Sequence, residues 1–165
     1  MADDAQTRKL ATIVALKAAR DARLDFRSRK EGICADRLVG YASVEAHACN
    51  PRAFDVLGLG TDALRRIPVN DAYEMDTAAL RAAIWADRDA GLTPFLVIGT
   101  AGTVNTGATD DLEALAECGV DRVCIADINA VSISKGLANV TSPRSITMTT
   151  SPLMSRCAKT SAKSP

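Results

Sequence analysis

Two short apolar runs constrain the fold of this chain more than any other feature of its sequence. Residues 95–98 (FLVI) and 123–126 (VCIA) are continuously apolar, which is typical of strands that a parallel sheet buries on both faces. Segments with helical patterning lie between these runs and before them. Because alternating strands and helices imply right-handed crossovers, we expect an α/β fold with a mainly parallel sheet and flanking helices.

Helix-like and strand-like segments also alternate before the first apolar run. In chain order we expect a helix over residues 5–30, a strand over 37–43, a helix from Asn50 to the glycines at 58 and 60, a strand over 63–69 and a helix from Asp76 to about Ala90. We expect Asn50 and Asp76 to cap their helices, because such side chains accept hydrogen bonds from first-turn amides. A last helix, capped by Thr109 or Asp110, is expected before the final strand.

The overall charge and the cysteine pattern exclude several classes of protein. The 165 residues suit one domain, and the balance of 20 basic against 20 acidic residues disfavours nucleic-acid and membrane-surface binding. No apolar run approaches the roughly 20 residues that cross a bilayer, and because residues 1–4 (MADD) lack a basic region followed by an apolar stretch, we expect no secretory signal. Five dispersed cysteines without C-x-x-C spacing and a single histidine predict reduced thiols and no metal site, so we expect a cytoplasmic chain.

Charge is distributed unevenly along the chain. All 20 acidic residues lie within residues 1–127, whereas residues 128–165 contain five basic residues, no acidic or aromatic residue and many Ser and Thr. A segment of that composition has little apolar surface to bury against the entropy of ordering. We therefore expect a folded body over 1–127 and a poorly ordered, basic, Ser/Thr-rich tail over 128–165.

Three segments follow predicted strands, at the edge where α/β sheets bind their ligands. They are residues 43–49 with His47, the Gly/Thr-rich loop 99–107, and Asp127. From the residues alone, His47 can be a structural residue, the loop a plain turn and Asp127 a cap. A His47–Cys49 nucleophile pair is disfavoured because positions i and i+2 do not face each other on a helix. A mononucleotide site is disfavoured because the loop lacks a phosphate-binding fingerprint.

The order of several short motifs is similar to that of a known enzyme family. Residues 41–47 (YASVEAH) resemble the Y-[AS]-S-x-x-[AS]-H segment of the group II pyridoxal-phosphate-dependent amino-acid decarboxylases, which include aromatic-amino-acid and glutamate decarboxylases. Further segments resemble the family in the same order: 57–60 (LGLG), 64–69 (LRRIPV), 75–76 (MD), 90–95 (AGLTPF) and 99–110 (GTAGTVNTGATD). The resemblance covers about residues 11–117.

This resemblance implies a fold-type-I, PLP-dependent transferase-like domain with pyridoxal 5'-phosphate as cofactor. It also implies carboxy-lyase action on a small-molecule amino-acid substrate and, as in the family, a homodimer. His47 matches the family histidine that stacks on the cofactor ring and contributes to the substrate pocket, so it is the predicted catalytic and cofactor-binding residue. Thr103 matches a threonine of the loop near the cofactor, although Val104 replaces the next family threonine. Asp127 stands near the position of the aspartate that pairs with the pyridine nitrogen.

Two family features have no match in this chain. Residues 7–10 (TRKL) stand where the family has a glycine-rich loop for the cofactor phosphate, although Arg8 and Lys9 could attract a phosphate by charge. No N-x-H-K-W segment supplies the lysine that bonds the cofactor, and Lys135 follows Asp127 too closely for that role. We therefore expect a partial cofactor domain over 1–127 that is inactive alone. The alternative is a non-catalytic α/β domain that associates with a partner chain or with itself.

Overall fold

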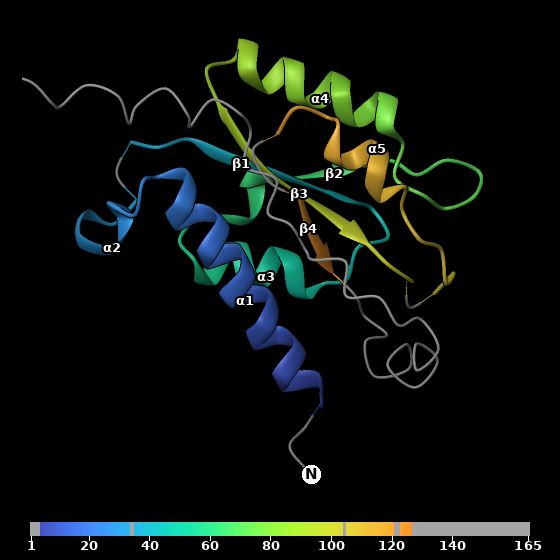
Figure 1. Cartoon of the computed structure of the whole chain (residues 1–165), viewed down its shortest axis with the longest axis horizontal. Helices are drawn as coiled ribbons and strands as arrows, with labels where there is room; N and C mark the ends of the chain where they lie inside the picture. Colours follow the sequence, from blue (N-terminus) through green and yellow to red (C-terminus); the bar gives the residue numbers. More distant parts are fainter. Residues whose placement is uncertain (1–3, 34, 104, 121–122, 127–165) are drawn as a thin grey trace, which may run out of the picture.

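The structure is a computed structural model that describes residues 4–33, 35–103, 105–120 and 123–126. In chain order its elements are α1 (Asp4–Arg23), α2 (Ser28–Glu31), β1 (Leu38–Ser43), α3 (Cys49–Val56), the 3-10 helix η1 (Thr61–Ala63), β2 (Leu64–Ile67), α4 (Thr77–Asp89), β3 (Thr93–Thr100), α5 (Leu112–Ala116) and β4 (Val123–Ala126). The strands form one sheet, which has helices on both of its faces (Figure 1).

The sheet has the strand order β2-β1-β3-β4, and every pairing among these described strands is parallel. β1 therefore lies inside the sheet, where Tyr41 is in register with Arg65 of β2 on one side and with Val97 of β3 on the other. A helix separates each strand from the next one in the chain, as parallel neighbours require. The predicted α/β fold with a mainly parallel sheet is confirmed.

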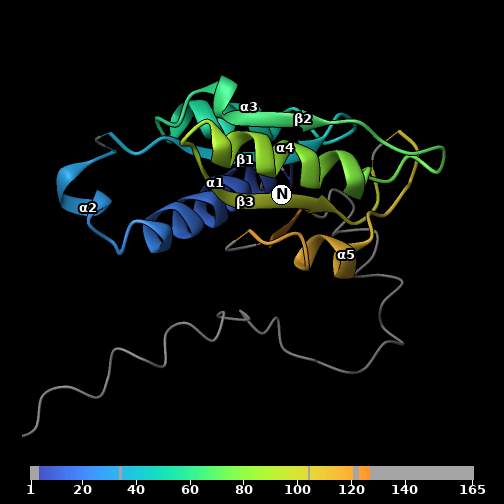
Figure 2. The same cartoon turned by 90° about the horizontal axis from the view of Figure 1, so that it is seen from above.

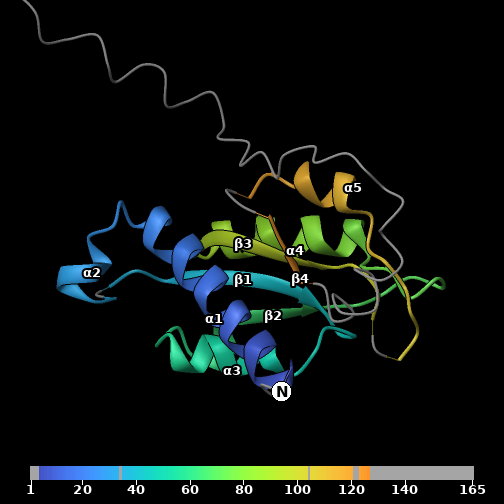
Figure 3. The same cartoon turned by 60° about the horizontal axis from the view of Figure 1, so that its bottom comes forward.

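Helices from different parts of the chain cover the two faces of the sheet. α1 and α3 lie on one face, and α4 and α5 lie on the other (Figures 1 and 3). Leu16 and Phe54 belong to the core of the first face, and Ile84 and Val97 belong to the core of the second. A Cβ atom on Gly40 would come within 2.7 Å of the Phe54 ring, so close packing of α3 over β1 needs a glycine there.

The helix predicted over residues 5–30 is interrupted, because the chain turns at residues 24–27 between α1 and α2. Asp25 and Phe26 have positive φ angles of 49° and 61°, which a continuous right-handed helix excludes. The buried Asp21 carboxylate accepts a hydrogen bond from the Ser28 hydroxyl at 2.9 Å, which requires the chain to fold back. The resulting α2 lies at one end of the molecule, opposite to the end toward which β2 and β3 point (Figure 2).

Among the predicted helix caps, one is confirmed and two are wrong. The Asp76 carboxylate accepts hydrogen bonds from two first-turn amides of α4 at 2.8 and 3.0 Å, as an N-cap does. Asn50 instead lies inside the first turn of α3, where its side chain is buried and does not cap the helix. Asp111 caps α5 through the Ala114 amide at 3.0 Å, because the carboxylate of the neighbouring Asp110 is buried and binds other amides.

Several predicted features lie outside the described residues. Asp127, Lys135 and the whole segment 128–165 are among them, so the division into a folded body and a poorly ordered tail stays a prediction. Within the residues that the structure does describe, no helix is long and apolar enough to cross a membrane.

Candidate functional site

The ends of two neighbouring strands bring two of the predicted site segments together. β1 ends at Ser43 and its partner β3 ends at Thr100, and parallel strands present their ends at the same side of a sheet (Figure 3). We call this region, residues 43–50 and 100–110, the carboxyl edge. In open α/β sheets, ligands bind outside the carboxyl ends of the strands.

His47 lies in the loop between β1 and α3, and its side chain is exposed. Its Nδ1 atom accepts a hydrogen bond from the Cys49 amide at 3.1 Å, and its carbonyl oxygen accepts one from the Asn50 amide at 3.1 Å. Because Nδ1 is an acceptor, the neutral ring carries its proton on Nε2. The carboxyl edge therefore presents an accessible flat ring with one N–H donor, which can stack on a planar ligand.

Thr103 ties together the loop that follows β3. Its side chain is buried, its hydroxyl contacts the Thr106 hydroxyl, and its Oγ1 atom accepts a hydrogen bond from the Thr106 amide at 3.3 Å. The Thr103 amide donates to the Ala108 carbonyl at 2.9 Å, and its carbonyl accepts from the Gly107 amide at 2.9 Å. The Thr103 hydroxyl is thus engaged within the loop, where it stabilises the turn.

Asp110, which ends the family-like segment 99–110 and was predicted as a possible helix cap, is a structural anchor of the carboxyl edge. Its buried carboxylate accepts hydrogen bonds from the Met75 amide and the Thr100 amide, each at 2.7 Å. It therefore joins the end of β3 to the segment before α4. Two consecutive aspartates at 110 and 111 are a sequence feature that could have indicated this role, because only one of them is needed to cap α5.

Three buried polar atoms at the carboxyl edge have no hydrogen-bond partner among the described residues. They are the Ser43 Oγ, the Asn50 Nδ2 and the Thr100 Oγ1 atoms. An unpaired buried polar group costs about 1–3 kcal/mol, so its position is favourable where a ligand supplies the missing partner. The hydroxyl groups of Ser43 and Thr100 at the strand ends and the amide donor of Asn50 in α3 therefore have unused hydrogen-bonding capacity.

Residues 7–10, which replace the expected phosphate-binding loop, form part of the helix α1. α1 approaches the carboxyl edge with its first half, since Thr12 Oγ1 lies 3.8 Å from Cys49 Sγ. The described backbone therefore has a helix where a glycine-rich loop would cup a phosphate. Attraction of a phosphate by Arg8 and Lys9 stays a prediction.

Tyr41, the first residue of the YASVEAH motif, has a structural role. Its hydroxyl donates to Asp87 Oδ2 at 2.9 Å, and the same carboxylate binds the Arg65 Nη2 atom at 2.9 Å. Burial, together with the hydrogen bond to the Asp87 carboxylate, raises the pKa of Tyr41 well above its usual range. The phenol therefore stays neutral and links β1 to α4 and β2.

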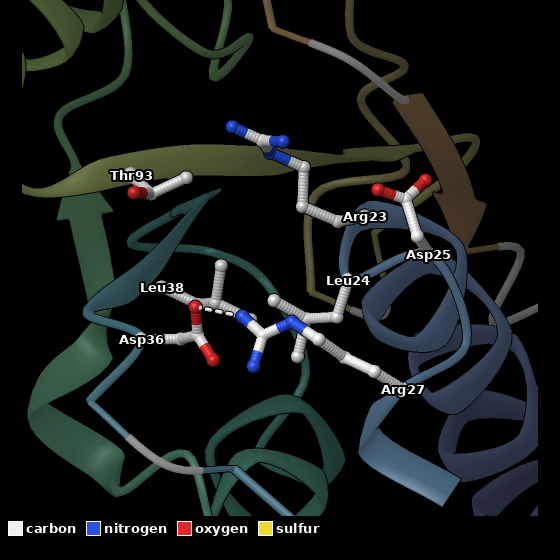
Figure 4. Close-up of a pocket in the computed structure, with 7 residues that line it drawn as sticks. All are labelled: Arg23, Leu24, Asp25, Arg27, Asp36, Leu38 and Thr93. Carbon is white, nitrogen blue, oxygen red and sulfur yellow. Dashed lines mark hydrogen bonds and ion pairs between the residues drawn. The ribbon is translucent and has the colours of Figure 1, made fainter.

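A small hollow lies at the opposite edge of the sheet. Its lining residues come from the end of α1, the following turn, the segment before β1 and the first residues of β1 and β3, and they are Arg23, Leu24, Asp25, Arg27, Asp36, Leu38 and Thr93 (Figure 4). An ion pair between Arg27 and Asp36 crosses this hollow. The hollow lies at the strand ends opposite to the carboxyl edge and is therefore a separate feature. Among the described residues, no group of three or more His, Cys, Asp or Glu side chains could hold a metal ion.

Comparison with known proteins identifies the family. The model of the pyridoxal-dependent decarboxylase conserved domain matches residues 4–131. The chain belongs to the pyridoxal-dependent decarboxylase family. The predicted family and the fold-type-I fold class are confirmed, and pyridoxal 5'-phosphate is the cofactor that the family and its solved structures indicate.

Three known proteins show how much of the decarboxylase fold this chain contains. L-tyrosine/L-DOPA decarboxylase 2 of Lophophora williamsii is 37% identical over 113 residues, which are 67% of this chain and 21% of that protein. The structure of Oryza sativa TDC with PLP and tryptamine has a TM-score of 0.63 at 35% identity and covers 71% of this chain and 25% of that one. Apo mouse CSAD has a TM-score of 0.68 at 28% identity, with coverages of 72% and 26%. This chain thus spans about a fifth to a quarter of the length of these relatives.

The structure describes two of the three site residues predicted for this decarboxylase-family chain. The structure places His47 and Thr103 on loops that follow adjacent strands, while Asp127 lies outside the described residues. Contact of any of the three with the cofactor stays a prediction. At the carboxyl edge the exposed imidazole of His47 suits stacking on the ring of pyridoxal phosphate, and the hydroxyl groups of Ser43 and Thr100 have no hydrogen-bond partner among the described residues.

Proposed function

We propose that this chain forms the part of a pyridoxal-phosphate-dependent amino-acid decarboxylase that holds the cofactor ring at the carboxyl edge. The observation that carries the proposal is the exposed His47 ring at the end of the central strand β1, with its Nδ1 atom held by the Cys49 amide. Residues in such a position can stack on the flat ring of the cofactor. When bound, the pyridine ring takes up the electrons that remain when a carboxylate leaves as carbon dioxide.

The residues of the carboxyl edge would then have separate roles. His47 would cover one side of the cofactor ring, exclude water there and contribute its Nε2–H donor to the substrate pocket. Ser43 and Thr100 would supply hydroxyl hydrogen bonds, since both Oγ atoms lack a partner among the described residues. Thr103 would keep the neighbouring loop in shape, and Asp127 would hold the protonated ring nitrogen by its negative charge.

A titration with pyridoxal 5'-phosphate tests this function. We expect the wild-type chain to bind the cofactor, and His47→Ala to weaken binding about two- to twelvefold, because ring stacking contributes about 0.5–1.5 kcal/mol. Absorbance of the bound cofactor measures the dissociation constant. Trp85→Ala, which removes an exposed ring from α4, is the matched control and should leave the constant unchanged. Equal affinities for wild type and His47→Ala would contradict the proposal.

We further propose that the 165-residue chain does not decarboxylate amino acids by itself. The support is the helix at residues 7–10 in place of a phosphate-binding loop and the lack of a family lysine segment in the sequence. Incubation with pyridoxal phosphate and aromatic amino acids should release no carbon dioxide. Borohydride treatment should attach no cofactor to Lys135. Release of carbon dioxide, or cofactor fixed on Lys135, would overturn this part of the proposal.

A second candidate function is association with a partner chain or with a second copy of this chain. Exposed apolar side chains on two helices favour it: Leu10 and Val14 lie one turn apart on α1, and Trp85 lies on α4. Homodimer formation, as predicted from the family, belongs to this candidate.

A cytoplasmic location is also part of the proposal, because the described cysteines Cys49 and Cys118 are both free thiols.

A further inference from the structure

We propose that Arg66 is a positioning residue for His47. The guanidinium group stands on β2, the strand at the edge of the sheet, and is itself exposed. Its Nη2 atom donates hydrogen bonds to the carbonyl oxygens of Val44 at 2.5 Å and Ala46 at 3.5 Å. These two carbonyls stand on either side of Glu45, and the second belongs to the residue directly before His47. Arg66 is thus hydrogen-bonded to the backbone of the loop that carries the imidazole.

The loop has few other anchors beyond its first residue. The Val44 amide donates to the Ile67 carbonyl at 2.9 Å, which continues the β1–β2 ladder by one step. The Ala46 amide donates to the Ser43 carbonyl at 3.1 Å and so forms a tight turn. Among the described residues, the hydrogen bonds of Arg66 are the contacts that tie this turn to a different strand through a side chain.

Loss of this tie would affect a ligand more than it affects the fold. An exposed ring on a loose loop samples several orientations, and binding must then restrict it at a cost in entropy. Arg66 lowers that cost by holding the backbone before His47 in one shape. Both carbonyl oxygens accept from the same Nη2 atom, so a lysine ammonium group, which also has several N–H donors on a more flexible stem, can keep part of this contact, whereas a neutral glutamine loses its charge assistance.

The neighbouring Arg65 shows that the position of an arginine on β2 decides its role. Successive side chains of a strand point to opposite faces of the sheet. Arg65 binds the Asp87 carboxylate of α4 at 2.9 Å, while Arg66 forms no ion pair among the described residues. The charge of Arg66 is therefore directed at the loop carbonyls rather than at a carboxylate.

The single histidine of the chain provides a direct test that needs no cofactor. In proton–carbon NMR spectra of the full chain, the ring signals of His47 are identified without further assignment. We expect Arg66→Gln to move these signals toward their positions in the urea-unfolded chain. Arg66→Lys should move them less, and the charge-matched control Arg81→Gln, an exposed arginine on α4, should leave them unchanged. Unchanged His47 signals in Arg66→Gln would overturn the positioning role.

A second arm measures cofactor affinity, and it rests on the proposed function of His47. We expect Arg66→Gln to weaken pyridoxal 5'-phosphate binding measurably but by no more than His47→Ala does, because a loosened loop loses at most the stacking of the His47 ring. We expect the double variant His47→Ala/Arg66→Gln to bind no more weakly than His47→Ala, since Arg66 acts through His47. Independent, additive losses would overturn the positioning role.

The two arms separate failure of this inference from failure of the proposed function. If the wild-type chain binds no cofactor, the proposed function fails, and the NMR arm still decides whether Arg66 orders the His47 loop. Thermal unfolding of each variant, measured in parallel, should show equal melting temperatures for Arg66→Gln and Arg81→Gln. A large fall in melting temperature for Arg66→Gln alone would indicate a general structural role and would overturn the proposal.

Discussion

Thr100 and Thr103 lie three positions apart at the end of β3, yet their hydroxyl groups have different surroundings. Both side chains are buried. The Thr103 hydroxyl is paired with Thr106, whereas the Thr100 Oγ1 atom has no partner among the described residues. Residue type therefore does not decide the role of a threonine in this loop. The difference is set by which backbone groups come within reach of each hydroxyl.

Replacement of each threonine by valine separates these roles. Valine keeps the shape of threonine, so Thr100→Val should leave the free energy of unfolding of the cofactor-free chain unchanged or raise it by up to about 1 kcal/mol. Thr103→Val should lower it by about 1 kcal/mol, because the Thr106 amide loses its acceptor. Urea unfolding measures both values. A larger loss for Thr100→Val than for Thr103→Val would contradict this account of the loop.

Asp110 is the residue whose substitution should most disturb the carboxyl edge. In Asp110→Asn, an amide group replaces one of the two oxygens that accept hydrogen bonds from the Met75 and Thr100 amides. One backbone amide then faces another donor, and we expect a loss of about 1–3 kcal/mol in the free energy of unfolding. The adjacent Asp111→Asn is the matched control, because asparagine also caps helices and should change stability by less than about 0.5 kcal/mol. Equal effects of the two variants would refute the anchoring role of Asp110.

At the scale of elements, the turn after α1 depends on one buried carboxylate. Asp21 accepts hydrogen bonds from Lys17 at 2.5 Å, Arg20 Nη2 at 2.8 Å and Ser28 at 2.9 Å. Burial by itself would raise the pKa of Asp21, but the hydrogen bonds from Lys17, Arg20 and Ser28 outweigh it and hold the pKa well below its usual range. The ionised carboxylate thus joins α1 to α2.

This lowered pKa predicts how stability depends on pH. The carboxylate is more acidic in the folded chain than in the unfolded chain, where its pKa is about 3.9. The contribution of the Asp21 carboxylate to the free energy of unfolding is therefore present above about pH 4 and is lost as the pH falls below that value. Urea unfolding from pH 7 to pH 2 should show a smaller decrease for Asp21→Asn than for wild type. Asp25→Asn, at an exposed residue, is the control. The prediction would be contradicted if Asp21→Asn lost as much free energy of unfolding between pH 7 and pH 2 as the wild type does.

At the scale of the whole molecule, the helices α1 and α4 each present apolar side chains to solvent. Leu10 and Val14 on α1 are 62% and 58% exposed, and Trp85 on α4 is 64% exposed. Single exposed apolar side chains are common, but Leu10 and Val14 lie on one stripe of the same helix. This stripe is the feature of the described chain that most favours association.

Light scattering tests whether the chain associates through this apolar stripe. We expect the average mass of the chain to rise with concentration, because burial of the Leu10–Val14 stripe removes apolar surface from water. The double variant Leu10→Lys/Val14→Lys should keep the mass nearer to that of one chain, whereas Trp85→Lys should have a smaller effect. A wild-type chain that stays monomeric at every concentration would count against the second candidate function.

Strands and helices of this chain could be predicted from local patterns to different degrees. The strand at 95–98 and the helix capped by Asp76 were predicted because apolar runs and capping residues are local signals. The break after α1 and the true position of Asn50 were not predictable in that way. The break depends on a buried side-chain hydrogen bond between Asp21 and Ser28, and the position of Asn50 depends on its burial in α3, and neither has a local sequence signal.

The candidate site divides in the same manner. His47 and Thr103 could be predicted because they lie in short motifs whose order resembles the decarboxylase family. The roles of Arg66 and Asp110 could not be predicted, since the motifs in which they lie do not indicate which residues they contact. Arg66 binds carbonyls 20 and 22 positions earlier in the chain, and Asp110 binds an amide 35 positions earlier. Strand pairing and loop packing create these contacts.

The sequence alone determined that this chain is an α/β protein of the pyridoxal-dependent decarboxylase type. Periodicity predicts the α/β class, because it reflects the local geometry of strands and helices, and the order of the motifs carries the resemblance to the family. Only the tertiary structure decided that β1 and β3 are neighbours, which places the His47 and Thr103 loops at one edge of the sheet. It also decided which buried polar groups have partners, because hydrogen bonds depend on distances between residues that the order of the sequence does not specify.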